Sequence, residues 1–167
     1  MNGPRHSRWE VINRYLATAI GSHRIPTWSL GPAREAAFSG VWDDLVAAAL
    51  SPVARPVTDS NMNTSCVYEV DGEGTLYVST VLPFVIAWDA ERRAFSDTAP
   101  PWAEHLTGFG FAYMDSSSTR TLSPYVDAEA DRRITYFELL FEWIEGSDGP
   151  DPSTLVGQRD IYRQQGI

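Results

Sequence analysis

The spacing of apolar residues changes once along this chain, and that change limits the possible fold more than any other feature of the sequence. Before residue 51 the apolar residues recur every three or four positions, as on one face of an α-helix. From Thr64 onward they alternate with other residues, as they do along a β-strand. Helices that precede a run of strands are typical of segregated layers. The sequence therefore predicts an α+β fold, with two N-terminal helices packed on one face of a mostly antiparallel sheet.

Two amphipathic segments make up the predicted helical part. Residues 7–20 carry apolar side chains at helical spacing, beginning with Trp9, and Gly21 follows where a helix C-terminus favours glycine. Residues 32–50 repeat this spacing and have a proline near their start, which suits the first turn of a helix. We therefore expect helical structure in both segments.

A β-hairpin is the clearest prediction for the next part of the chain. Residues 66–70 and 75–81 are rich in β-branched and aromatic residues, and they flank an Asp-Gly-Glu-Gly turn at 71–74. A third strand is predicted over 84–88. Further along, the sequence predicts a turn over 89–93, a short helix over 100–106, a strand over 109–113, a loop over 115–119 and a strand over 122–126.

Residues 134–144 fit two interpretations. Their apolar side chains follow a helical spacing, but every second residue from Phe137 to Trp143 is also apolar, as on a strand. The segment is rich in Ile, Thr, Tyr, Phe and Trp, which favour a pleated surface. We therefore predict a strand that pairs with residues 122–126 across a turn at 127–133.

The length and composition indicate one globular domain. The chain has 167 residues, of which 43% are hydrophobic and 12% are aromatic, enough for a single core. We expect a domain spanning 1–167, with a loose N-terminus at 1–7, an internal connection at 51–63 and a polar C-terminal segment at 146–167, which includes a short helix at 155–163.

A cytoplasmic location is the simplest expectation. No apolar run approaches the roughly 18 residues that a membrane helix needs, and the stretch 15–20 is too short for a signal peptide. The single cysteine, Cys66, forms no internal disulfide and lies in an apolar strand, where a thiol is unreactive. We expect no membrane partner.

The chain contains no lysine: its 13 basic residues are all arginine, against 22 acidic residues, for a net charge of −9. Schiff-base chemistry and a P-loop both require lysine and are excluded. GC-rich coding sequence also accounts for arginine in place of lysine. Residues 61–88 hold three acids and no base, and residues 89–167 hold 14 acids against seven arginines. This excess disfavours nucleic acid and favours a basic protein partner.

An acidic turn is the first candidate surface for such a partner. Asp127, Glu129 and Asp131, together with Glu138, follow the spacing of a calcium-binding loop. Arg132 stands where that loop requires glycine, so we expect no metal. Asp127, Glu129 and Asp131 are instead candidate contacts for basic side chains of a partner.

Two tryptophans are candidate anchors of a protein interface. Trp28 and Trp102 lie in proline-containing loops, whereas the other four lie in periodic apolar segments typical of a core. Exposed tryptophan side chains contribute strongly to binding at interfaces. The alternative is that each packs its own loop onto the core.

A catalytic site would have to be assembled by the fold, because no cofactor or hydrolase motif is present. His105 is the best candidate for acid–base chemistry, with Tyr113 and Asp115 as its possible partners. The alternative is a surface histidine at the end of a short helix. No cofactor is expected in either case.

These observations favour a non-catalytic, acidic protein-binding module over an enzyme. The leading hypothesis is an inhibitor of the immunity-protein or antitoxin type, which binds a basic partner protein. An acidic chaperone for a secreted effector belongs to the same class. The alternative from another class is a small cofactor-free enzyme or ligand-binding protein with an aromatic-lined pocket.

Overall fold

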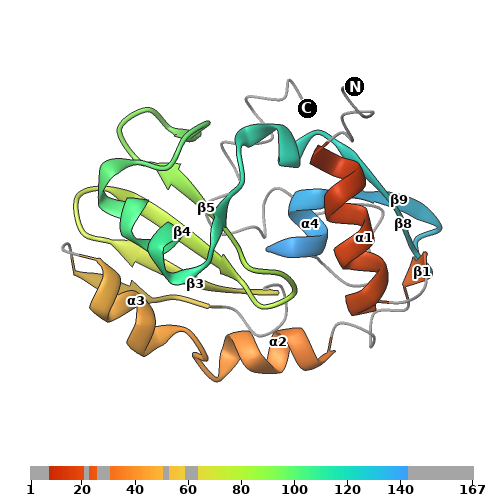
Figure 1. Ribbon diagram of the computed structural model, residues 1–167, viewed down its shortest axis with the longest axis horizontal. Coiled ribbons are helices and arrows are strands. Elements are labelled where there is room, and N and C mark those ends of the chain that lie inside the picture. The colour runs from red at the N-terminus through yellow and green to blue at the C-terminus, as the bar shows by residue number, and fades with distance from the viewer. Residues whose placement is uncertain (1–7, 21–22, 26–30, 51–52, 59–63, 143–167) are drawn as a thin grey trace, which may run out of the picture.

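The computed structural model describes residues 8–20, 23–25, 31–50, 53–58 and 64–142 (Figure 1). The predicted C-terminal segment at 146–167, the loose N-terminus at 1–7 and part of the connection at 51–63 lie outside the described residues. The elements in chain order are α1 (Arg8–Ile20), β1 (Arg24–Ile25), α2 (Gly31–Phe38), α3 (Asp43–Ala49), β2 (Ala54–Pro56), β3 (Ser65–Val70), β4 (Gly74–Ser79), β5 (Phe84–Asp89), β6 (Ala94–Phe95), the 3₁₀ helix η2 (Pro101–Phe109), β7 (Ala112–Tyr113), the 3₁₀ helix η3 (Ser116–Thr119), β8 (Leu122–Asp127), β9 (Arg132–Thr135) and α4 (Tyr136–Leu140).

The strands form two sheets in a mixed α/β arrangement. The large sheet has the order β2-β3-β4-β5-β6, with neighbours antiparallel, and β7 adds to β5 in parallel. The small sheet has the order β1-β8-β9. Figure 1 shows the sheets toward opposite ends of the long axis, with α1 and α4 between them in this view. The predicted hairpin is confirmed, since β3 pairs with β4 from Ser65–Ser79 to Val70–Gly74.

Both faces of the large sheet are covered in the middle of β5. Successive residues in the middle of β5, from Val85 to Trp88, are all buried, so neither face of that strand meets solvent. Two buried clusters lie on these faces. The α1 cluster contains Ile12, Leu16, Val67, Tyr77, Ile86, Trp88, Phe95, Met114, Tyr125, Ile134, Tyr136, Phe137, Leu139, Leu140 and Phe141. The α3 cluster contains Ala37, Val46, Ala49, Leu50, Cys66, Tyr68, Val70, Leu76, Val78, Val85, Ala103, Leu106 and Phe111.

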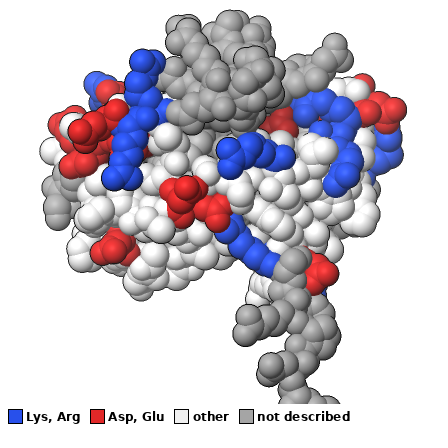
Figure 2. All heavy atoms as spheres, turned by 90° about the horizontal axis from the view of Figure 1, so that it is seen from above, with Lys and Arg blue, Asp and Glu red and all other residues white. Residues whose placement is uncertain are grey.

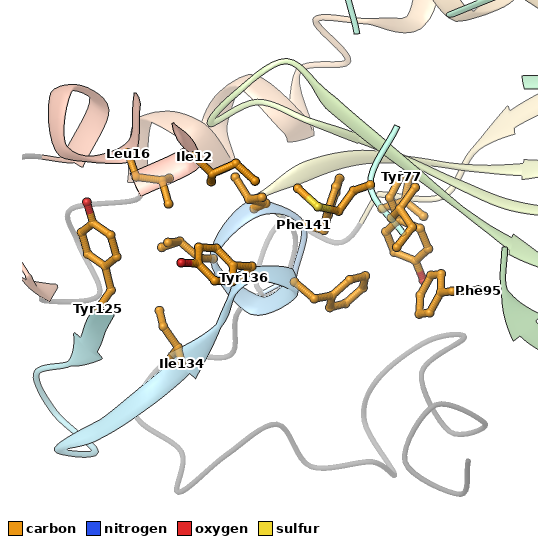
Figure 3. Close-up of a cluster of buried hydrophobic side chains, with 14 of the residues drawn as sticks. Ile12, Leu16, Tyr77, Phe95, Tyr125, Ile134, Tyr136 and Phe141 are labelled. Atoms are coloured by element: carbon orange, nitrogen blue, oxygen red, sulfur yellow. The ribbon is translucent and has the colours of Figure 1, made fainter. Parts of the chain in front are cut away.

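The two N-terminal helical segments belong to different clusters, so the predicted packing of both on one face of the sheet is not confirmed. Helix α1 contributes Ile12 and Leu16 to the α1 cluster, whereas α2 and α3 supply the other cluster. Figure 3 shows Ile12 and Leu16 above Tyr136, with Tyr125 of the small sheet on one side and Tyr77 of the large sheet on the other. An apolar strand such as β5 needs cover on both faces. Phe137 and Phe141 at α4 supply aromatic cover on the side of the α1 cluster, and α2 and α3 contribute to the cluster on the other side.

The second predicted helical segment, 32–50, is interrupted. Gly40 adopts a φ of 72° between α2 and α3, and a Cβ there would lie 2.3 Å from an Asp43 carboxylate oxygen. This left-handed residue ends the periodic pattern. Phe38 and Val41, which follow the helical spacing, are 67% and 52% exposed as a result.

The prediction of a strand over 134–144 is wrong for residues 136–142, and residues 143 and 144 lie outside the described residues. Strand β9 ends at Thr135, which caps α4: its hydroxyl accepts a hydrogen bond from the Glu138 amide, while the Glu138 carboxylate accepts one from the Thr135 amide. This reciprocal capping box is a local helix signal that outweighs the strand preference of the aromatic residues.

The short helix α4 is held against the large sheet by polar contacts at its C-terminal end. The hydroxyls of Ser65 and Ser79 donate to the carbonyls of Phe141 and Leu140 at 2.8 and 2.6 Å, and the Thr64 amide also donates to Phe141 at 3.0 Å. These bonds satisfy carbonyl groups that a five-residue helix leaves without an internal partner.

The turn between β3 and β4 yields a test of this architecture. Gly72 has a φ of 73° and open space where a Cβ would lie, whereas Gly74 has a φ of 152° and its Cβ would lie 1.9 Å from the Trp88 carbonyl oxygen. We expect Gly72→Ala to lower the free energy of unfolding by about 1–2 kcal/mol through backbone strain. Gly74→Ala should cost more, because it also displaces β5. Urea unfolding measures both, and equal losses would contradict this pairing geometry.

Candidate functional site

An open groove lies at the end of the large sheet that is remote from α4. It is formed where the β3–β4 turn meets the end of β5, and the Ala90 amide donates to the Glu73 carbonyl across this junction at 3.0 Å. Its volume is about 420 Å³. We call it the hairpin groove, and it is lined by Val57, Val67, Glu69, Val70, Gly72, Glu73, Gly74, Thr75, Trp88 and Ala90.

Strand register explains why these side chains meet. The pairings place one residue from each of five strands in a single row across the sheet: Arg55, Glu69, Thr75, Trp88 and Phe95. The row beside it, nearer to α4, contains Val67, Tyr77 and Ile86. Because side chains alternate between faces along each strand, both rows lie on the face that carries the α1 cluster.

The hairpin groove begins where the cover of this face ends. In the inner row, Tyr77 contacts Phe137 and Phe141 edge to face, with ring centroids 5.7 and 6.5 Å apart. In the outer row, the Glu69 side chain is 55% exposed and Thr75 is half-buried. The floor is therefore apolar at Val67 and Trp88, and the accessible rim is polar.

The rim carries more acids than bases. Glu69, Asp71 and Glu73 are all exposed on β3 and the turn after it. The Arg55 guanidinium forms an ion pair with Glu69, and its hydrogen bond to that carboxylate raises the pKa of Arg55. An apolar floor with a carboxylate rim suits a cationic side chain whose aliphatic stem packs on the floor.

The surface charges are mixed on the face that Figure 2 shows. Acidic side chains lie beside arginines in several places, and one acidic group at the lower left is surrounded by uncharged surface.

Of the two predicted tryptophan anchors, only Trp102 lies among the described residues. Trp102 is half-buried at the start of η2 and packs against the α3 cluster. Trp28 lies outside the described residues. Trp102 therefore contributes to holding its own loop on the core.

The carboxylates of the predicted acidic turn have different roles. Asp127 is buried, and its carboxylate accepts hydrogen bonds from the amides of Glu129 and Ala130 at 2.9 and 3.0 Å. Asp131 pairs with Arg24 at 2.7 Å, and Glu129 is exposed. The Asp127 carboxylate thus stabilises its own turn and is not displayed to a partner.

The predicted catalytic residues are not assembled into one site. His105 is exposed on η2, and no hydrogen bond or ion pair of the described residues joins it to Tyr113 or Asp115. The Tyr113 hydroxyl accepts from the Ala87 amide at 3.2 Å and donates to the Ser96 carbonyl at 2.8 Å. Burial raises the pKa of Tyr113 to about 12. These bonds fix β7 beside β5.

Asp115 has a structural role at the start of η3. Its carboxylate caps this helix by accepting from the Ser117 amide at 2.9 Å, and it forms an ion pair with Arg8 of α1. Burial would raise the pKa of Asp115, but the hydrogen bonds from Ser117 and Arg8 outweigh it, so the pKa is lowered.

The described residues contain neither a candidate metal-binding group nor a candidate membrane-spanning helix. No group of three or more His, Cys, Asp or Glu side chains there is arranged to hold a metal ion. None of the described helices has both the length and the apolar character that crossing a bilayer requires. Cys66 is buried, and this burial raises the pKa of its thiol.

The hairpin groove was not predicted from the sequence, although one signal for it is present. The acids of residues 61–88 all fall on β3 and its turn, in a stretch that lacks any base. What the sequence does not give is the position of Trp88 two strands away, or the point at which α4 stops covering the sheet.

No protein-family model, no curated protein and no solved structure matches this chain. The function is therefore inferred from the chemistry of the site alone.

The Asp115 contacts predict a pH-dependent stability. A carboxylate with a lowered pKa stabilises the fold above its ordinary value of 3.8, and this contribution is lost as the pH falls through the lowered pKa. At pH 7 we expect Asp115→Asn to unfold at a lower urea concentration than the wild type, and at pH 2.5 to 3 the difference should shrink. Glu104→Gln, an exposed charge on η2, is the control. A difference that is constant from pH 7 to pH 3 would contradict this role.

Proposed function

We propose that this protein is a non-catalytic, acidic binding module whose hairpin groove binds a basic partner protein, in the manner of an immunity protein or antitoxin. The observation that carries this proposal is the combination of an apolar floor with the exposed carboxylates of Glu69 and Glu73, which line the groove. A cytoplasmic location, where the single cysteine stays reduced, belongs to the same proposal.

The proposal is supported by the physical chemistry of association. Exposed charges of one sign steer an oppositely charged partner toward the site and raise its association rate. Val67 and Trp88 are almost fully buried in the floor of the groove, so apolar surface beside them, such as that of the half-buried Val57, contributes affinity once water is displaced. The acidic turn at 127–133 offers less of this, because the buried Asp127 carboxylate accepts hydrogen bonds from the amides of its own turn.

An acidic chaperone for a secreted effector would use the same chemistry. It differs from an inhibitor in binding a partner segment that is not folded. The enzyme hypothesis receives less support, because Tyr113 and Asp115 are engaged in structural hydrogen bonds away from His105.

The proposal is tested by capturing the partner with charge variants. The tagged wild type is incubated with lysate of the source organism, washed at low and high salt, and the bound proteins are identified by mass spectrometry. We expect one stoichiometric basic protein whose retention weakens with salt. The double variant Glu69→Gln, Glu73→Gln should bind that purified partner about tenfold more weakly, mainly through a slower association rate.

A matched control removes two charges from the other acidic surface. Glu129→Gln with Asp131→Asn removes the same two negative charges from the net charge of −9 but leaves the hairpin groove intact. It should bind the partner almost as the wild type does. Equal losses of affinity in the two double variants would show that binding depends only on overall charge, which would contradict the groove as the site. A loss confined to the control would place the interface on the β8–β9 turn.

A further inference from the structure

We propose that the hairpin groove recognises an arginine side chain of the partner, and that Arg55 competes with it for the Glu69 carboxylate in the unbound protein. This inference rests on the proposed function, because it specifies the partner group that the same groove binds. It follows from the ion pair that the Glu69 carboxylate already forms with Arg55.

The protein itself shows that the Glu69 carboxylate accepts a guanidinium. Arg55 lies directly opposite Glu69 in the pairing of β2 with β3, and it reaches across to form the ion pair. The pair lies in the row that continues through Thr75 to Trp88, so an arginine from outside would approach the same carboxylate from the groove side.

This internal pair is suited to exchange. Strand β2 is the edge of the large sheet, and the side chains of Arg55 and Glu69 are 68% and 55% exposed. Exposed ion pairs contribute little to stability, because water and salt screen them. An incoming guanidinium can therefore replace that of Arg55 without a rearrangement of the core.

An arginine of the partner would contact more of the groove than Arg55 does. Arg55 is outside the lining, whereas a side chain inserted from solvent would place its methylenes against Val57, Val67 and Trp88. Glu73 lines the same groove and supplies a second carboxylate. A planar guanidinium presents several donors to two carboxylates at once, which the compact ammonium of lysine matches less well.

Competition by Arg55 lowers the apparent affinity for the partner. Only the fraction of molecules in which Glu69 is released can bind fully, and removing the competitor raises this fraction. The Arg55→Ala variant should therefore bind an arginine ligand about two- to fivefold more tightly, the factor that corresponds to the strength of an exposed ion pair.

The test is a titration of the ¹⁵N-labelled full-length protein with two capped hexapeptides, followed in ¹H–¹⁵N correlation NMR spectra. One alternates glycine with arginine, and the other alternates glycine with lysine. We expect the arginine peptide to shift the signals of Glu69, Thr75 and the Trp88 indole, and to bind Arg55→Ala more tightly than the wild type. The lysine peptide should bind more weakly, and Glu69→Gln should reduce the response to the arginine peptide.

Arg24→Ala is the matched control. Arg24 also forms an exposed ion pair, with Asp131, so this variant removes the same charge from a similar pair in the small sheet. It should leave the affinity for the arginine peptide close to that of the wild type. Equal gains in Arg55→Ala and Arg24→Ala would overturn the inference, as would equal binding of the two peptides or signal changes confined to residues outside the groove.

Failure of this inference is distinguishable from failure of the proposed function. If the captured partner depends on Glu69 and Glu73 but Arg55→Ala binds it no more tightly than Arg24→Ala does, the competition is overturned and the binding function stands. If neither partner nor peptide responds to the groove variants, both are overturned.

Discussion

The attachment of α4 to the large sheet is the constraint on which the rest of the structure depends. This short helix is capped at its start by Thr135 and Glu138, and its last carbonyl groups accept hydrogen bonds from serine hydroxyls of β3 and β4. In this position it brings Phe137 and Phe141 onto Tyr77 and joins the two sheets through one core (Figure 3). Because α4 is only five residues long, it covers only part of the sheet face. The hairpin groove is the part that it leaves uncovered, so the element that completes the core also sets the limit of the candidate site.

Local signals in the sequence were sufficient for part of the fold. The β3–β4 hairpin and helix α1 were predicted because their turn residues and apolar spacing act over a few neighbouring positions. The capping box at Thr135 is equally local, but the strand preference of the aromatic residues around it suggested the wrong structure for the residues of α4. The break at Gly40 is a matter of one backbone angle, which the apolar periodicity of 32–50 does not reveal. Which face each helix covers depends on contacts between distant segments, and no local pattern encodes them.

The candidate site also combines features that the sequence reveals with features that depend on the fold. Sequence spacing brought Asp127 and Asp131 together as an acidic surface, but spacing cannot tell a carboxylate that accepts amides of its own turn from one that faces solvent. The hairpin groove needs a correct register across β2, β3, β4 and β5 before Glu69 and Trp88 become neighbours in one row. The excess of acid over residues 61–88 was visible in the sequence, and only the fold places it beside an apolar floor.

Because the chain has no lysine, the ion pairs described here all join a guanidinium to a carboxylate. Their roles therefore differ according to how deeply each pair is buried. The Arg132–Glu138 pair joins side chains that are 21% and 6% exposed, and the same Glu138 completes the cap of α4. Loss of either partner would leave a largely buried charge without compensation, so this pair belongs to the fold. The Arg55–Glu69 pair has the same two functional groups, but on an exposed sheet edge where water competes with every contact. A pair that adds so little to stability is free to exchange its cation, and it is placed where an exchange would bring a partner onto the apolar floor at Trp88.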